Sequence, residues 1–243
     1  MNETEYRAWR GRLRQVMSAL VAESIAGGAA SETTGVMELV LDARQPGYVT
    51  PRRGTVWVPD GAIRAALDTL QASGGVKRVR LIDGLYPPRF MSALRALGLR
   101  LVDERPLRLL ALDESTGSGQ TEWGARPVLD VPDRARWKAF PGQTHDLLPP
   151  GVHDWLLSAD GADCAAARFG AAGGRAARLI GWNATGPAQN PASARLLLEA
   201  AGASPALDID LLFSEISADD DHAFFQALGF RETGAILTFE GDP

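Results

Sequence analysis

Two short phrases of this sequence are almost identical. Residues 96–100 read ALGLR, and residues 227–231, which lie 131 positions later, read ALGFR. The agreement extends upstream without a gap, so that residues 62–100 match residues 193–231. A match of this length indicates that a whole supersecondary unit is duplicated, and each copy reads as helix, strand, helix, strand. Side chains that agree at this offset include Arg64 with Arg195, Leu67 with Leu198, and Asp68 with Glu199.

The first half of the chain begins with an amphipathic segment. Apolar residues recur at three- and four-residue spacing through residues 3–26, which predicts a helix, and Gly27-Gly28 ends it. The small residues of 29–35 predict a flexible segment. Strand and helix signals then alternate. We expect strands at 36–41, 55–58, 76–82 and 99–112, and helices at 62–71 and 89–97, with Asp60 as the N-cap of the helix at 62–71.

A polar stretch separates the two halves. Residues 113–120 read DESTGSGQ, and such small polar residues bury little apolar surface. We therefore predict a first domain at 1–112, a linker at 113–122 and a second domain at 123–243. In the second domain we expect strands at 125–129, 163–169, 175–182, 207–216 and 230–239, and helices at 132–140, 152–157, 192–201 and 218–228.

Composition limits the classes of protein to consider. The chain has 243 residues, of which 45% are hydrophobic, and no apolar run approaches the ~20 residues that span a bilayer. The acidic N-terminus lacks the features of a signal peptide. A formal charge of −5 argues against a nucleic-acid binder, and the single cysteine, Cys164, excludes a multi-cysteine metal site. We expect a cytoplasmic protein with no metal site and no nucleic-acid or membrane partner.

The end of the second copy is characteristic. Residues 222–234 read HAFFQALGFRETG, and they follow strand, helix, helix, two strands, helix and strand. This order and phrase resemble the GNAT acetyltransferase superfamily, in which the last helix reads as an alanine, an aromatic pair ending in Tyr, then three residues and Gly-Phe. The resemblance, together with the duplication, implies an α/β (α+β) fold of two GNAT-like mixed β-sheet units flanked by helices and preceded by an N-terminal helix.

The resemblance implies an acyl-CoA site in the second half. The family holds the pyrophosphate on a loop and helix start with the pattern Gln/Arg-x-x-Gly-x-Gly/Ala, where backbone N–H groups face the anion. Here Ala192 replaces the first glycine, and Pro191 removes a donor. The expected cofactor is acetyl-CoA or another acyl-CoA. The residues expected to contact it are Gln189, Asn190, Ala192, Ser193 and Ala194, with the backbone of Ile180, Gly181 and Trp182 polarising the acyl carbonyl.

The first copy is predicted to have lost this site. If Trp57 and Trp182 are equivalent strand ends, the connection to the next helix is shorter in the first copy by the length of the phosphate loop. Asp60 at the helix start would also repel a phosphate. We therefore expect a degenerate N-terminal copy that packs against the second copy and completes a groove.

Catalytic groups are less clearly marked. The family's frequent general acid, a Tyr in the last helix, corresponds to Phe225 here and to Leu94 in the first copy, and neither can donate a proton. Glu215 and His145 are candidate bases that the positions suggest, although a surface polar residue or a helix cap is the favoured interpretation of each. Other candidates are the residues 219–222 and the pair His153-Asp154.

Three functions follow from the resemblance. The first is an acyl-CoA-dependent N-acyltransferase that transfers an acetyl or other acyl group to the amine of a small molecule. The second is a catalytically degenerate binding or regulatory module of the same fold. The third, which the acidic balance disfavours, is aminoacyl transfer from a charged tRNA. The chain is expected to be a monomer with an internal pseudo-dimer, or a homodimer.

Overall fold

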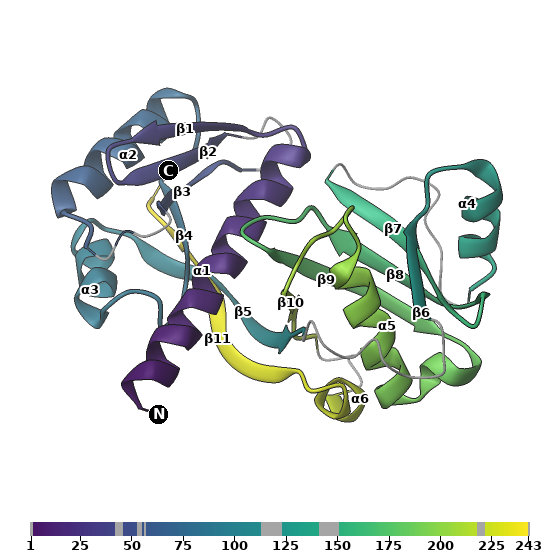
Figure 1. Cartoon of the computed structure of the whole chain (residues 1–243). Helices are drawn as coiled ribbons and strands as arrows, with labels where there is room; N and C mark the ends of the chain where they lie inside the picture. The colour runs from purple at the N-terminus through teal and green to yellow at the C-terminus, as the bar shows by residue number, and fades with distance from the viewer. Residues whose placement is uncertain are drawn as a thin grey trace.

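The eleven strands that the structure describes form one mixed sheet flanked by helices (Figure 1). The strand order is β1-β2-β3-β4-β11-β5-β10-β9-β8-β7-β6. The predicted mixed α/β class with an N-terminal helix is confirmed, and the two expected units share one continuous sheet. The coordinates come from a computed structural model and describe residues 2–41, 46–52, 55, 57–112, 123–140, 151–217 and 222–242.

The elements of the first half include a long N-terminal helix, α1, which starts with a capping box in which the Asn2 side chain accepts from the Glu5 N–H. The bounds are α1 Glu3–Ala26, β1 Ala30–Thr34, β2 Met37–Leu41, β3 Tyr48–Pro51, α2 Asp60–Ala72, β4 Arg78–Ile82, α3 Pro88–Ala96 and β5 Arg100–Ala111.

The elements of the second half follow residues 113–122, which lie outside the described part of the chain, so the domain boundary stays a prediction. The bounds are β6 Trp123–Pro127, α4 Val131–Lys138, β7 Val152–Ala159, β8 Ala162–Gly170, β9 Ala176–Ala184, the 3₁₀ helix η1 Gly186–Gln189, α5 Pro191–Ala203, β10 Leu211–Glu215, α6 His222–Ala227 and β11 Arg231–Glu240.

Three predicted elements were wrong. Residues 30–34 form the edge strand β1 rather than a flexible segment, since pairing with β2, and not apolar burial, holds this exposed strand. Residues 55–58 contain no strand among their described members, and the strand lies earlier, at β3. Residues 152–157 belong to β7 and not to a helix. Most of the β7 side chains are buried on both faces, so the alternation that marks a half-exposed strand is missing.

The repeated phrase ends a helix in both copies. Gly98 and Gly229 have φ angles of +80° and +92°, a conformation that glycine adopts without strain. Beyond them, the Leu99 N–H donates to the Leu94 carbonyl, and the Phe230 N–H donates to the Phe225 carbonyl. Farther upstream, α2 and α5 both have 13 residues, and their bounds differ by the same offset as the repeated phrase.

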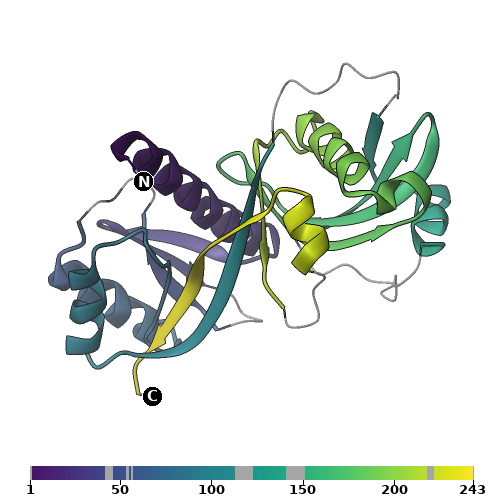
Figure 2. The same cartoon turned by 90° about the horizontal axis from the view of Figure 1, so that it is seen from below.

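The two halves exchange their last strands. β11, from the end of the chain, lies between β4 and β5 of the first half and runs antiparallel to both. β5 in turn pairs with β10 of the second half. Figure 2 shows β5 and β11 side by side as they cross between the halves. Because β11 of the second half and β5 of the first half each pair with strands of the other half, neither half completes its sheet alone.

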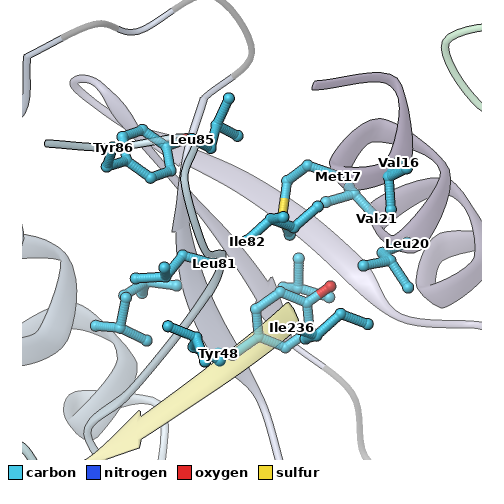
Figure 3. Packing of buried hydrophobic residues seen from close by; sticks show 14 of the residues in the cluster. Val16, Met17, Leu20, Val21, Tyr48, Leu81, Ile82, Leu85, Tyr86 and Ile236 are labelled. Carbon is cyan, nitrogen blue, oxygen red and sulfur yellow. The ribbon is translucent and has the colours of Figure 1, made fainter. Parts of the chain in front are cut away.

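Helix α1 covers one face of this shared sheet. Leu13, Val16 and Leu20 are buried in the first-half core, and Figure 3 shows Met17 and Val21 across from Ile82. The Trp9 Nε1 donates to Thr233 Oγ1 at 2.6 Å, which ties the helix to the last strand. Burial of such side chains stabilises the fold by about 25 cal/mol for each Å² of apolar surface removed from water.

Candidate functional site

In the second half, the parallel pair β9 and β10 separates at its end. The pairing runs only from Ala176 opposite Leu211 to Arg178 opposite Phe213, whereas β9 continues to Ala184. Ile180, Gly181 and Trp182, the residues expected to face the acyl carbonyl, lie on the separated segment. The Ile180 side chain is 41% exposed, and the Trp182 ring packs against the second-half core. The separation leaves one edge of β9 without a strand partner.

The start of α5 carries the residues expected to bind phosphate. Gln189 and Ala192 are exposed, Ser193 is half-buried, and Ala194 is fully buried in the core. The Asn190 side chain accepts from the Ala192 N–H at 2.9 Å, and Pro191 has no N–H to donate. The chain itself therefore already caps this helix start.

Glu215 lies at the end of β10 in a network of ion pairs. Its two carboxylate oxygens accept from Arg178 at 2.8 Å and from Arg105 at 3.4 Å. Arg178 also pairs with Glu23 of α1. Burial raises the pKa of the Glu23 carboxyl, and the Arg178 guanidinium opposes this shift only in part. A guanidinium on each oxygen has to be displaced before Glu215 can accept a proton, and its role as a base stays a prediction. His145, the other candidate base, lies outside the described residues.

The first half has an equivalent separation, between β3 and β4. These parallel strands pair only at Val49 opposite Val79. Because β3 ends at Pro51 and α2 begins at Asp60, the connection at 52–59 is no shorter than the connection at 185–190 in the second half. The strand assumed at 55–58 is absent among the described residues, so the equivalence of Trp57 and Trp182 does not hold. Counted from the paired residues instead, Asp60 follows Val49 by 11 positions and Pro191 follows Ala176 by 15, and the loss of a phosphate loop from the first copy stays a prediction.

The start of α2 differs from the start of α5. Its N-cap is Pro59 and not Asp60, and no side chain caps it. A Cβ atom added at Gly61 would have no heavy atom within 4 Å, so the backbone there faces open space. Arg64, one turn along, is exposed, whereas Arg195 at the same position of α5 donates to Glu199 and to two backbone carbonyls.

A cavity of about 370 Å³ lies between the start of α2 and helix α3. We call it the outer cavity. Trp57 and Arg89 contact each other at this cavity. The Arg89 guanidinium lies 4.0 Å from the centre of the half-exposed Trp57 ring, a cation–π contact. The residues that line it include Trp57, Asp60, Tyr86, Arg89, Phe90 and Ser92.

A second cavity, of about 140 Å³, lies between α1 and the sheet. We call it the inner cavity. It is lined by apolar side chains together with Arg14, Glu38 and Thr50. The Thr50 side chain is 1% exposed, and its hydroxyl has no hydrogen-bond partner among the described residues. A buried hydroxyl without a partner is costly, so this position is suited to a polar ligand.

The two cavities share one side chain, Tyr86. It lies in the connection between β4 and α3, four residues after the end of β4, and Figure 3 shows it beside Leu85 at the edge of the cluster. Burial raises the pKa of the Tyr86 hydroxyl, which therefore stays protonated at neutral pH. Because Tyr86 lines both cavities, its protonated hydroxyl is a candidate proton donor to a bound ligand.

Comparison with known proteins identifies the architecture. The sequence matches no protein-family model and no curated protein. Solved structures do match. A GCN5-related N-acetyltransferase from Kribbella flavida aligns with a TM-score of 0.57 at 15% identity, over 93% of this chain and 96% of its own. The chain has a GNAT-like fold.

Two further solved structures align along most of this chain. A tandem GNAT protein from the clavulanic acid biosynthesis pathway has a TM-score of 0.51 at 13% identity and covers 100% of this chain and 97% of its own. The protein L-PGS from Bacillus licheniformis has a TM-score of 0.51 at 10% identity and covers 90% of this chain and 86% of its own. At these identities the likeness concerns the fold alone.

The first half contains a candidate site that sequence reasoning missed. The two cavities surround Tyr86 in the first half, which the sequence treated as degenerate. One signal was present: an aromatic residue lies in the short connection after the apolar strand and directly precedes Pro87-Pro88 at the helix start. Its place beside the inner cavity could be recognised only once β3 was located at Tyr48–Pro51. In the described part of this GNAT-like chain, no helix has the length and apolar character to cross a membrane.

Proposed function

We propose that the protein is an acyl-CoA-dependent N-acyltransferase that transfers an acetyl or other acyl group to the amine of a small molecule. One observation carries this proposal: two cavities lie at the separated pair β3 and β4 and share the Tyr86 side chain. A reaction between two substrates needs adjoining sites that bring the reacting atoms together.

The outer cavity supports binding of the acyl-CoA in the first half. The uncapped start of α2 offers backbone N–H groups, and Gly61 leaves room for a phosphate to approach. Arg89 brings positive charge to the cavity, which offsets the carboxylate of Asp60, and the exposed Arg64 lies one turn into the same helix. The second-half residues from Gln189 to Ala194 stay an alternative cofactor site, which the Asn190 cap makes less open.

The residues around Tyr86 support a direct transfer. Bound acyl-CoA would supply a thioester that an amine can attack. Tyr86 is suited to give a proton to the sulfur as the carbon–sulfur bond breaks. Glu38 lines the inner cavity with a carboxylate suited to take a proton from the attacking nitrogen. A neutral amine thus loses one proton to Glu38 while the sulfur gains one from Tyr86, and both groups are restored when Glu38 releases its proton and Tyr86 takes one up. An amine bound as the ammonium first loses one further proton to solvent.

A binding or regulatory module is the second candidate function. It is favoured by the residues at the two positions where the family often has a Tyr as general acid. Leu94 is fully buried, and the Phe225 ring lies beneath the Arg108 guanidinium at 3.4 Å and packs against Phe230. Both positions therefore serve packing, and a module that binds without catalysis would need neither Tyr.

Calorimetric titration of the full chain with acetyl-CoA separates the two functions, with ATP as a control for general anion binding. A transferase is expected to bind acetyl-CoA more tightly than ATP and to release free thiol when an acceptor amine is added. Absence of both heat and a thermal shift at millimolar acetyl-CoA would refute the transferase. Binding without thiol release from any amine tested would favour the module.

A further inference from the structure

The inner cavity is lined by one cationic and one anionic side chain that form no ion pair with each other. Arg14 approaches from α1, and Glu38 approaches from β2. Both side chains are half-buried, and neither makes an ion pair with the other or with any other side chain in the described part of the chain. Partly desolvated charges are costly when unpaired. A ligand with one charge of each sign would pair both.

The polar groups on the sheet side form one cluster. Glu38 and Thr50 lie directly opposite each other on β2 and β3, so their side chains share the face that α1 covers. Ser31 Oγ donates to Glu38 Oε1 at 2.6 Å, which orients this carboxylate and leaves its other oxygen available to a ligand. With the unpartnered Thr50 hydroxyl, the sheet side offers oxygen acceptors suited to an ammonium group.

The helix side offers a different group. The Arg14 guanidinium has a fork of N–H donors that matches a carboxylate. The neighbouring hydroxyl on this side, Ser18 Oγ, already donates to the Arg14 carbonyl, so the guanidinium is the group that α1 presents to an anion. Acceptors on the sheet and a cation on the helix define an orientation for a ligand with two unlike ends.

The remaining wall and the volume limit the size of the ligand. Met17, Val21, Pro51 and Leu85 give the cavity an apolar wall. Its volume of about 140 Å³ is close to that of an engineered cavity that holds benzene, at roughly 150 Å³. This space suits a small aliphatic side chain rather than a peptide or a nucleotide.

We infer that the inner cavity binds a small α-amino acid with an aliphatic side chain, its carboxylate at Arg14 and its ammonium at Glu38 and Thr50. This placement brings the nitrogen to the sheet, beside the separated strands where Tyr86 lies. The role of this amino acid as acyl acceptor rests on the proposed function, whereas its binding does not require acyl-CoA.

The test is a calorimetric titration of the full chain, without acyl-CoA, with three probes of similar shape. L-Valine carries both charges, L-valinamide lacks the carboxylate, and 3-methylbutanoate lacks the ammonium. L-Valine is expected to bind at least about tenfold more tightly than either analogue, because each analogue leaves one charged side chain of the cavity unpaired. Equal affinities for all three, or no heat from L-alanine, L-valine and L-leucine at millimolar concentration, would overturn the inference.

Two variants assign the ends of the ligand. Arg14→Gln is expected to weaken L-valine about tenfold and to leave L-valinamide unchanged, since only the former has a carboxylate to lose. Glu38→Gln should weaken both amines and spare 3-methylbutanoate. The controls Arg12→Gln and Glu32→Gln, at exposed positions of α1 and β1, should change neither. Equal losses from Arg14→Gln and Arg12→Gln would contradict the assignment.

The two proposals fail separately. If acetyl-CoA binds and L-valine does not, the amino-acid site is overturned and the transferase proposal stands. If L-valine binds with the expected discrimination and acetyl-CoA does not, the cavity assignment stands and the proposed transfer is overturned.

Discussion

The two halves of the chain keep the same helix and differ at its first turn. Helices α2 and α5 have equal lengths and matching positions in the repeat. At the start of α5 the Asn190 side chain accepts from the Ala192 N–H, and Arg195 donates to Glu199. At the start of α2, no side-chain cap is formed, and Arg64 is exposed. The two helices thus share their length and their place in the repeat, while a side chain caps the start of α5 and none caps the start of α2.

The largest expected difference concerns the matched arginines. Arg195→Ala should destabilise the protein by about 3–5 kcal/mol, because it leaves the buried Glu199 carboxylate without its guanidinium partner. Arg64→Ala, at the equivalent position of the first half, should change the free energy of unfolding by less than about 0.5 kcal/mol. Urea unfolding measures both. Similar losses from the two variants would remove the contrast between a structural and an exposed arginine.

A smaller effect is expected from the shared aromatic residue. Tyr86→Phe should lower kcat roughly hundredfold, equal to about 2.7 kcal/mol, with L-valine as acceptor, because the leaving sulfur loses its proton donor. KM should change little, since the ring that lines both cavities remains. Ser217→Ala, at the equivalent position of the second half, should leave kcat unchanged. An unaltered kcat in Tyr86→Phe would exclude Tyr86 as the general acid.

The smallest effect is expected at the closed helix start. Asn190→Ala removes the side-chain cap of α5 and should cost about 1 kcal/mol of stability, measured by thermal unfolding. Acetyl-CoA affinity should not change, because the cap belongs to the half without the proposed cofactor. A gain or loss of affinity in this variant would show that the second half also contacts the cofactor.

Local signals explain which elements could be predicted from the sequence. The repeat located the helices α2 and α5, and the glycines that follow α3 and α6 marked their ends, because these features depend on short-range backbone geometry. Strands β1 and β7 could not be predicted in the same way. One is an exposed edge held by pairing, and the other is buried on both faces, so neither shows a period of two.

The candidate site was harder to predict, because it depends on contacts between distant segments. Arg14, Glu38, Thr50 and Tyr86 come from four elements or connections, and no motif joins them in the sequence. The exchange of β5 and β11 was also hidden, since strand order is a property of the whole sheet. The motif-like loop near Gln189 was visible, yet its cap became apparent only in the structure.

The most direct test is an acetyl-CoA titration of two matched variants, Gly61→Glu and Ala192→Glu. Both place a carboxylate at the second position of a helix, α2 or α5, and both positions tolerate a side chain, because Gly61 faces open space and Ala192 is exposed. If the first half holds the cofactor, Gly61→Glu should weaken binding about tenfold or more through repulsion of the phosphates, and Ala192→Glu should not. Loss of binding in Ala192→Glu with wild-type affinity in Gly61→Glu would contradict this account.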